Sequence, residues 1–281
     1  MESVFVFALE KRFHIWYTSE KQGCATMNAK GILNFILDLV FPPVCEVCGC
    51  AAPHGESVCR ECLTKFRKEM FYKCPSCGQT ADKCTCGISD NTVWKTRICG
   101  KSFLSLTFYL NISNKSSERV TEKMIYAFKE KKALLDFFAK TEAEALKRLF
   151  DSAGYDIHEW ILTFPPRSEK KYNEYGYDQS EEAVKRMANL LGCEWAYTLR
   201  RNGGCEQKAL SADERESNAE ETMSLIRENI VAGGKYIVFD DIFTTGATIN
   251  AAAKYLIFGG AAEVFPITIA KTLYTKKGLH K

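Results

Sequence analysis

The sequence predicts an α/β domain, built on a mainly parallel sheet flanked by helices and preceded by a small cysteine-rich module. Three observations lead to this prediction. Eight of the thirteen cysteines form four closely spaced pairs between residues 45 and 86, strand and helix patterns alternate from residue 160 onward, and one buried strand pattern ends in two acids. With 281 residues, 46% of them apolar and 26% charged, the chain fits two folded domains. The net charge of +3 is too small to indicate nucleic-acid binding by itself.

The amino-terminal segment, residues 1–30, shows no clear pattern and is treated as an uncertain extension. It precedes a helix pattern that ends at Pro42 and has four apolar residues at helical spacing, Ile32, Phe35, Ile36 and Leu39. Two interpretations of residues 1–26 stand side by side: translation starts at Met27, or the segment is a disordered tail. We expect one helix-plus-cysteine module over residues 31–88 and the α/β domain over residues 100–281.

No segment has the pattern of a signal peptide or of a membrane span. The apolar stretch at 4–9 is short and is followed at once by charged residues, and the stretch at 32–44 is too short to cross a bilayer. Disulfides persist mainly in oxidising compartments. We therefore expect a cytoplasmic protein without a membrane span, whose reduced thiolates bind metal.

The four cysteine pairs predict structural zinc. Two pairs supply the four thiolates of a tetrahedral zinc site, and a two-residue spacer turns both sulfurs of a pair toward one ion. The simplest partition gives one zinc to Cys45, Cys48, Cys59 and Cys62, and a second to Cys74, Cys77, Cys84 and Cys86. The spacer between Cys84 and Cys86 is one residue short, so the sequence does not decide whether the module binds one zinc or two. Cys50 and His54 are alternative ligands. A module of this size has too little apolar core to fold without metal.

The α/β domain alternates predicted strands and helices. Strands are expected at 103–110, 160–164, 195–199, 236–239 and 264–269, and helices at 117–150, 178–191 and 247–258. The polar stretch 200–221 fits no element, and loops of this length are usually functional or mobile.

The most specific pattern is KYIVFDDIFTTGATINAAAKYL, residues 235–256. A buried strand pattern ends in Asp240 and Asp241, at the end of the strand where open α/β sheets bind ligands. The loop that follows and the start of the next helix offer backbone N–H groups and hydroxyls to an anion: Thr244, Thr245, Gly246, Ala247 and Thr248. This pattern resembles the motif with which type I phosphoribosyltransferases bind 5-phosphoribosyl diphosphate (PRPP). It predicts a phosphoribosyltransferase-like fold, with the two acids as catalytic candidates that bind the ribose and, through the diphosphate, Mg²⁺.

Basic residues suggest two further roles. Five are candidates for binding the diphosphate of PRPP: Arg167, Lys170, Lys171, Lys208 and Arg215. Residues 95–150 also carry twelve Lys and Arg against six Asp and Glu, and Tyr126, Phe128 and Lys129–Lys132 mix aromatic and basic side chains. Surfaces that bind single-stranded DNA have this mixture, but Phe128 also fits the apolar stripe of a helix. A single-stranded DNA or helicase partner is therefore an alternative to an enzyme, as is a sensor of PRPP or a nucleotide without catalysis.

The chain resembles the ComF family over residues 31–272. The resemblance begins with the FPPVC segment that leads into an eight-cysteine module, and it includes the PRPP motif. Four shorter segments also match: YAFKEKK at 126–132, Phe164-Pro165, YGYDQ at 175–179 and IAKT at 269–272. The polar loop matches at Gln207, Lys208, Leu210, Ser211, Arg215 and Asn218. It implies a zinc-binding, phosphoribosyltransferase-like protein of competence and DNA uptake, with phosphoribosyl transfer as the expected activity. Tyr175 stands where the family has Arg, and Asp178 where it has Asn, so one expected diphosphate contact is missing.

Overall fold

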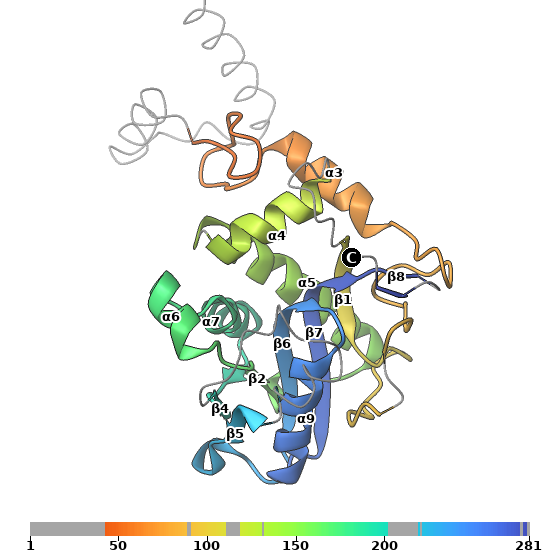
Figure 1. Ribbon diagram of the computed structural model, residues 1–281, viewed down its shortest axis with the longest axis vertical. Coiled ribbons are helices and arrows are strands. Elements are labelled where there is room, and N and C mark those ends of the chain that lie inside the picture. The colour runs from red at the N-terminus through yellow and green to blue at the C-terminus, as the bar shows by residue number, and fades with distance from the viewer. Residues whose placement is uncertain are drawn as a thin grey trace, which may run out of the picture. The chain divides into compact units, whose positions relative to one another are not determined.

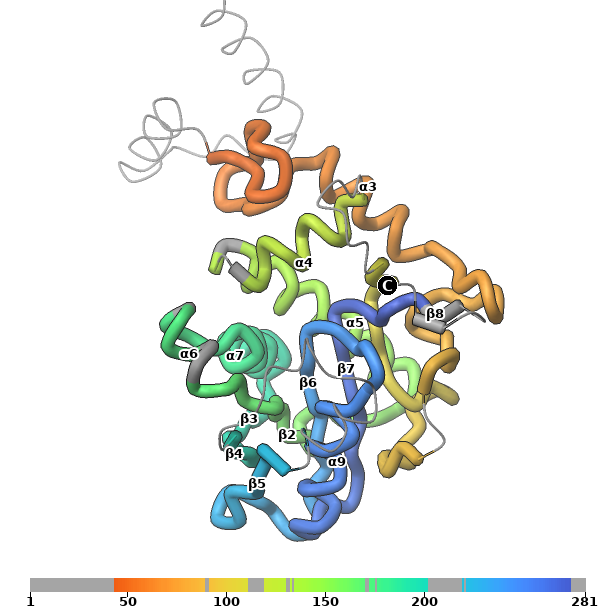
Figure 2. Tube along the Cα trace, viewed as in Figure 1, coloured from red at the N-terminus to blue at the C-terminus, as the bar shows by residue number. Residues whose placement is uncertain are grey.

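The computed structural model describes residues 43–88, 91–110, 119–130, 132–201, 219, 221–275 and 278–279. They belong to one compact unit, Pro43–Lys281, which Figures 1 and 2 show as ribbon and as tube. The predicted helix before Cys45 and the uncertain extension lie outside the described residues. Within the part that is described, no helix has the length and apolar character needed to cross a membrane.

A five-stranded parallel sheet forms the centre of this unit. Its order is β1 (Leu104–Tyr109), β7 (Glu263–Thr272), β6 (Lys235–Phe243), β2 (Trp160–Thr163) and β3 (Glu194–Trp195). Two short antiparallel pairs stand apart from it, one of β4 (Leu199–Arg201) with β5 (Met223–Leu225) and one of β8 (Tyr274–Thr275) with β9 (Gly278–Leu279). The predicted fold class, a mainly parallel sheet flanked by helices behind a cysteine-rich module, is confirmed.

Alternate residues of β6 face two different cores because successive side chains of a strand point to opposite faces. Ile237 and Phe239 lie in a core with α5 (Leu135–Ala153) and α7 (Gln179–Leu191). Tyr236 and Val238 lie in the other core, with α9 (Ala247–Phe258). Helices therefore cover both faces of the sheet, with α9 on the near side in Figure 1.

The cysteine module runs from residue 43 to residue 88 and contains α3 (Arg60–Met70). This helix contacts α4 (Val120–Glu130). The ring of Phe66, on α3, packs edge to face against Phe137 and Phe138 of α5, at centroid distances of 5.7 and 5.9 Å. The module therefore shares its apolar core with the helices that cover the sheet.

Several predicted boundaries are wrong. The single helix predicted over 117–150 is two helices, α4 and α5, with a 3₁₀ turn η1 (Lys132–Leu134) just before α5. The strand predicted at 236–239 continues to Phe243, because β7 extends far enough to pair with it through Phe243–Lys271. The strand predicted at 195–199 is only Glu194–Trp195, and β4 then takes the first residues of the polar stretch, most of which lies outside the described residues.

Candidate functional site

Two adjacent carboxylates lie in the last part of β6. The ammonium of Lys129, near the end of α4, forms an ion pair with Asp241 at 3.0 Å. Asp240 accepts a hydrogen bond from the backbone N–H of Asp241 at 2.9 Å. Because the side chains of Lys129 and Asp241 are only 38% and 23% exposed, solvent weakens their attraction less than at an open surface.

The two acids have opposite ionisation behaviour. Burial, and then the negative charge of Asp241, raise the pKa of Asp240 to about 7, although Lys129 and Arg201 act to lower it. Burial also acts to raise the pKa of Asp241, but Lys129 outweighs it, so this pKa lies below its usual value. Near neutral pH, Asp241 is thus a fixed negative charge and Asp240 changes its protonation state.

A small pocket lies between Asp240 and the start of α9. It is lined by Asp240, Ile242 and Phe243 and by residues 244–249, which include all five loop residues singled out from the sequence. Gly246 caps α9 with a φ of +80°, which favours glycine, and a Cβ there would lie 2.5 Å from Cζ of Phe243. The first N–H groups of a helix have no partner within it, so this pocket offers donors to an anion.

The start of α7 holds two parts of the site together. Asp178 caps α7 by accepting from the backbone N–H groups of Ser180 and Glu181, and its other oxygen accepts from the backbone N–H of Arg167 at 2.7 Å. The side-chain amide of Gln179 donates to the carbonyl of Lys129. The YGYDQ segment therefore positions Arg167 and Lys129, and the aspartate at 178 fixes the Arg167 loop itself.

Sequence reasoning missed two cations of this site. Lys129 was named as a candidate for binding DNA and as part of the family-like segment at 126–132 but not as a residue of this site, and Arg201 was not singled out. Burial lowers the pKa of Arg201, and Asp240 and Asp178 act to raise it. Within the described residues, Nε and Nη2 of Arg201 are buried without a hydrogen-bond partner. Its position at the start of the unassigned polar stretch 200–221 was the one signal that could have indicated it.

The predicted diphosphate candidates are only partly described. Arg167 lies in the loop after β2, and its positive charge lowers the pKa of Asp241. Lys170 and Lys171 are on α6 (Glu169–Tyr175), but their side chains are outside what the structure describes. Lys208 and Arg215 lie wholly outside the described residues. Of the predicted DNA-binding residues, Phe128 is fully buried and Tyr126 is 64% exposed.

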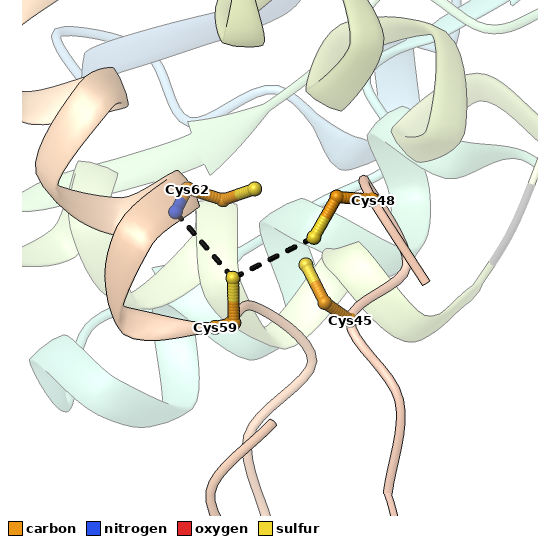
Figure 3. A group of neighbouring side chains, drawn as sticks. All are labelled: Cys45, Cys48, Cys59 and Cys62. Atoms are coloured by element: carbon orange, nitrogen blue, oxygen red, sulfur yellow. Dashed lines mark hydrogen bonds between the residues drawn. The ribbon is translucent and has the colours of Figure 1, made fainter. Parts of the chain in front are cut away.

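The eight paired cysteines form two groups of four, with the same members as the two predicted metal sites. The sulfurs of Cys45, Cys48, Cys59 and Cys62 lie within 4.8 Å of one another, as do those of Cys74, Cys77, Cys84 and Cys86. We call these cluster 1 and cluster 2. In Figure 3 the sulfurs of cluster 1 converge from a loop and from the first turn of α3. Among the described residues, neither group includes Cys50 or His54.

The distances fit zinc. Zn–S bonds of about 2.3 Å in a tetrahedron put neighbouring sulfurs about 3.8 Å apart. One contact in each cluster measures 3.6 Å, between Cys48 and Cys59 and between Cys77 and Cys84. The short spacer of Cys84 and Cys86 thus does not keep this pair out of the second group.

Each cluster begins with a similar turn. The N–H of Gly49 donates to the carbonyl of Cys45, and that of Gly78 donates to the carbonyl of Cys74, both at 2.8 Å. Burial acts to raise the pKa of both Cys45 and Cys74, but backbone hydrogen bonds to the sulfurs lower each to about 7. The chain therefore stabilises one thiolate in each cluster, which favours binding of a cation.

Comparison with known proteins identifies relatives along most of this chain, although no family model matches it. It is 26% identical over 215 residues to competence protein ComFC of Streptococcus pneumoniae, covering 76% of this chain and 87% of that protein. It is 28% identical over 225 residues to ComFC of Bacillus subtilis, covering 77% and 85%. The DNA utilization protein YhgH of Salmonella typhimurium is 32% identical, over 43% of this chain and 53% of that protein.

Solved structures of phosphoribosyl enzymes give weaker matches. Adenine phosphoribosyltransferase from Leishmania tarentolae is 15% identical, with a TM-score of 0.33, over 52% of this chain and 74% of that one. Phosphoribosylpyrophosphate synthetase from Mycobacterium smegmatis is also 15% identical, with a TM-score of 0.31, over 49% and 34%. At these scores the likeness adds nothing to what the sheet order shows. The chain is therefore similar to competence protein ComFC over about three quarters of its length.

Proposed function

We propose that this protein binds Mg²⁺ and PRPP at the carboxyl end of β6 and acts in the handling of DNA by the cell. The observation that carries the proposal is the acid pair Asp240 and Asp241, followed at once by the anion pocket at 244–249. In this proposal the pocket holds the 5-phosphate, and the two acids accept hydrogen bonds from the ribose hydroxyls. The reduced thiols needed by both cysteine clusters favour a cytoplasmic location.

Three cations around the acids support the same ligand. Lys129 comes from α4, Arg167 from the loop after β2 and Arg201 from β4, so they approach from three elements. Without ligand, Lys129 pairs with Asp241 and Arg201 interacts with Asp240. A diphosphate would give Arg201 the acceptors that it lacks among the described residues.

Phosphoribosyl transfer is the reaction such a site would support. A nucleophile would form a bond to the anomeric carbon while the bond from that carbon to diphosphate breaks, and the diphosphate would leave with the electron pair. The chain would contribute orientation of the ribose and positive charge around the leaving group. Magnesium would add charge neutralisation on the diphosphate, and no described residue identifies the acceptor.

Calorimetry with PRPP and Mg²⁺ tests the proposal. The variant Asp240→Asn/Asp241→Asn should bind at least about 100-fold more weakly, because each lost hydrogen bond to a charged group contributes about 1.5–3 kcal/mol. A matched control is Asp136→Asn/Asp151→Asn, two acids with ion pairs elsewhere on the helices, which should bind like the parent. A folded parent that does not bind PRPP, or a double variant that binds it unchanged, would disprove the proposal.

Single-stranded DNA binding is a second candidate, favoured by a surface at the β3 edge of the sheet. The ammonium of Lys185 lies 5.1 Å from the ring centre of Trp195 and 6.0 Å from that of Tyr197. Bases stack on such basic and aromatic surfaces. Replacing Trp195 and Tyr197 by Ala should weaken the binding of a fluorescent oligothymidylate about tenfold or more, and unchanged binding would remove this surface from consideration.

A further inference from the structure

A lysine from the sheet domain lies buried beside cluster 2. Lys271, near the end of β7, is 1% exposed, and its ammonium donates to the carbonyl of Cys84 at 2.7 Å. The two residues are 187 positions apart in the sequence. Within the described residues, no carboxylate forms an ion pair with Lys271, whereas Lys235 of the neighbouring strand pairs with Glu159.

A buried ammonium without an anion nearby is strongly unfavourable. The anionic groups that act on Lys271 are the sulfurs of cluster 2, Cys84 and Cys86 first and then Cys74 and Cys77. Four thiolates around one Zn²⁺ leave a formal charge of about −2. A metal-loaded cluster 2 therefore supplies the negative charge that the burial of Lys271 requires, and Lys271 supplies part of the positive charge that the cluster requires.

The same lysine lies against the aromatic residues next to the anion pocket. Its ammonium is 5.1 Å from the ring centre of Phe103 and 5.6 Å from that of Phe243, and these two rings stack at 5.5 Å. Phe243 lines the pocket and lies so close to Gly246 that no side chain would fit between them. A continuous set of contacts thus runs from cluster 2 through Lys271 and Phe243 to the start of α9.

We propose that Lys271 is a positioning residue that couples metal binding at cluster 2 to the shape of the anion pocket. Its ammonium is the counter-charge of the metal–thiolate group, and its contact with Phe243 holds the ring against Gly246. Because it is buried, Lys271 does not bind a ligand of the pocket itself. The metal part of this proposal is independent of the proposed function, whereas the ligand part rests on it.

The metal part is tested by zinc competition with a chromophoric chelator. Lys271→Met should release one of its two zincs at a chelator concentration about 10–100-fold lower than the parent does, the range typical for partners just outside a metal's ligands. Lys235→Met is the matched control, since Lys235 is a lysine of the neighbouring strand that pairs with Glu159 and should leave both zincs unaffected. Lys271→Arg keeps the charge and should retain zinc better than Lys271→Met. Folded Met and Arg variants that hold both zincs as the parent does, or that lose zinc equally, would overturn the proposal.

Hydrogen exchange on the unaltered protein covers the case in which Lys271→Met does not fold. Withdrawal of zinc should accelerate exchange in residues 243–248 at least about tenfold while the helix Gln179–Leu191 keeps its rate. Unchanged exchange at 243–248, or equal acceleration in both segments, contradicts the coupling.

The ligand part uses PRPP with Mg²⁺ as the probe. Lys271→Met should bind it about tenfold more weakly than Lys235→Met does. If neither the parent nor a variant binds PRPP, the proposed function fails while the zinc and exchange results still decide the role of Lys271. If Lys271→Met loses zinc but binds PRPP as the parent does, the coupling to the pocket is wrong.

Discussion

Clusters 1 and 2 have the same ligands and similar opening turns, but they are attached to the sheet domain in different ways. Cluster 1 lies at the start of α3, where the sulfur of Cys59 accepts from the N–H of Cys62. At the other end of α3, Glu69 accepts from the backbone N–H groups of Val120 and Thr121, at 3.0 and 2.8 Å, and so caps α4. Cluster 2 instead contacts the end of β7 through Lys271.

The two attachments lead to different sides of the candidate site. From cluster 1 the contacts run along α3 and α4 to Lys129 and its ion pair with Asp241. From cluster 2 they run through Lys271 and Phe243 to the anion pocket. A similar set of cysteines therefore does not imply equal roles: the contacts from cluster 1 lead to Asp241, and those from cluster 2 lead to the pocket at 244–249.

Removing one ligand from each cluster should give the largest effects. Cys62→Ser and Cys84→Ser should each lower the zinc content from two to one and destabilise the protein by about 4 kcal/mol or more, because the metal supplies folding energy. Elemental analysis and urea unfolding measure the two quantities. The variants should differ in hydrogen exchange, with residues 243–248 affected by Cys84→Ser and α4 by Cys62→Ser. Identical exchange patterns would remove the distinction between the clusters.

The pH dependence of PRPP binding should give the next largest effect, because Asp240 lies between the two sides. Its pKa of about 7 in the ligand-free protein means that the carboxyl is neutral below pH 7 and ionised above it. If the ionised form accepts the ribose hydroxyls, affinity should fall about tenfold, or about 1.4 kcal/mol, for each pH unit below 7 and level off above it. In Asp240→Asn the carboxyl is absent, so any remaining pH dependence of affinity comes from the titration of PRPP itself. If affinity changed with pH equally in the parent and in Asp240→Asn, Asp240 would not be the titrating group that controls binding.

Glu69→Gln should have the smallest effect and tests the attachment of cluster 1. A glutamine offers one acceptor oxygen where Glu69 offers two, so α4 should lose part of its cap, at a cost of about 1 kcal/mol in urea unfolding. Glu61→Gln on the same helix is the control, since Glu61 forms only an exposed ion pair with Lys65. Zinc content should not change, and a Glu69 variant as stable as the control would show that this contact is unimportant.

Sequence patterns predicted the parts of the site that are local in the chain. The acid pair, the loop 244–248 and the two cysteine groups each depend on residues a few positions apart, whose spacing fixes their geometry. Lys129, Arg201 and Lys271 come from distant segments, and only the parallel pairing and the packing of helices bring them to the acids and to cluster 2. No spacing rule could have assigned these three residues.

Sequence patterns also failed to predict the full length of β6. The two acids end the apolar run, which suggested that the strand ends there as well. The structure continues it to Phe243 because ladder pairing depends on the partner strand, and β7 is buried along that stretch. This extension brings Phe243 opposite Lys271. The pairing of these two residues could not be predicted without the register of the two strands.

The order of strands in the sheet also determines how late in translation the sheet can form completely. Strand β1 is at the edge of the sheet and pairs with β7, which is made more than 150 residues later. A ribosome therefore releases all the ligands of cluster 2 long before Lys271 emerges. Until then cluster 2 lacks the neighbouring ammonium of Lys271, and β1 lacks the strand with which it pairs. The last strand of the five-stranded sheet to be translated thus completes that sheet and the surroundings of cluster 2 in a single step.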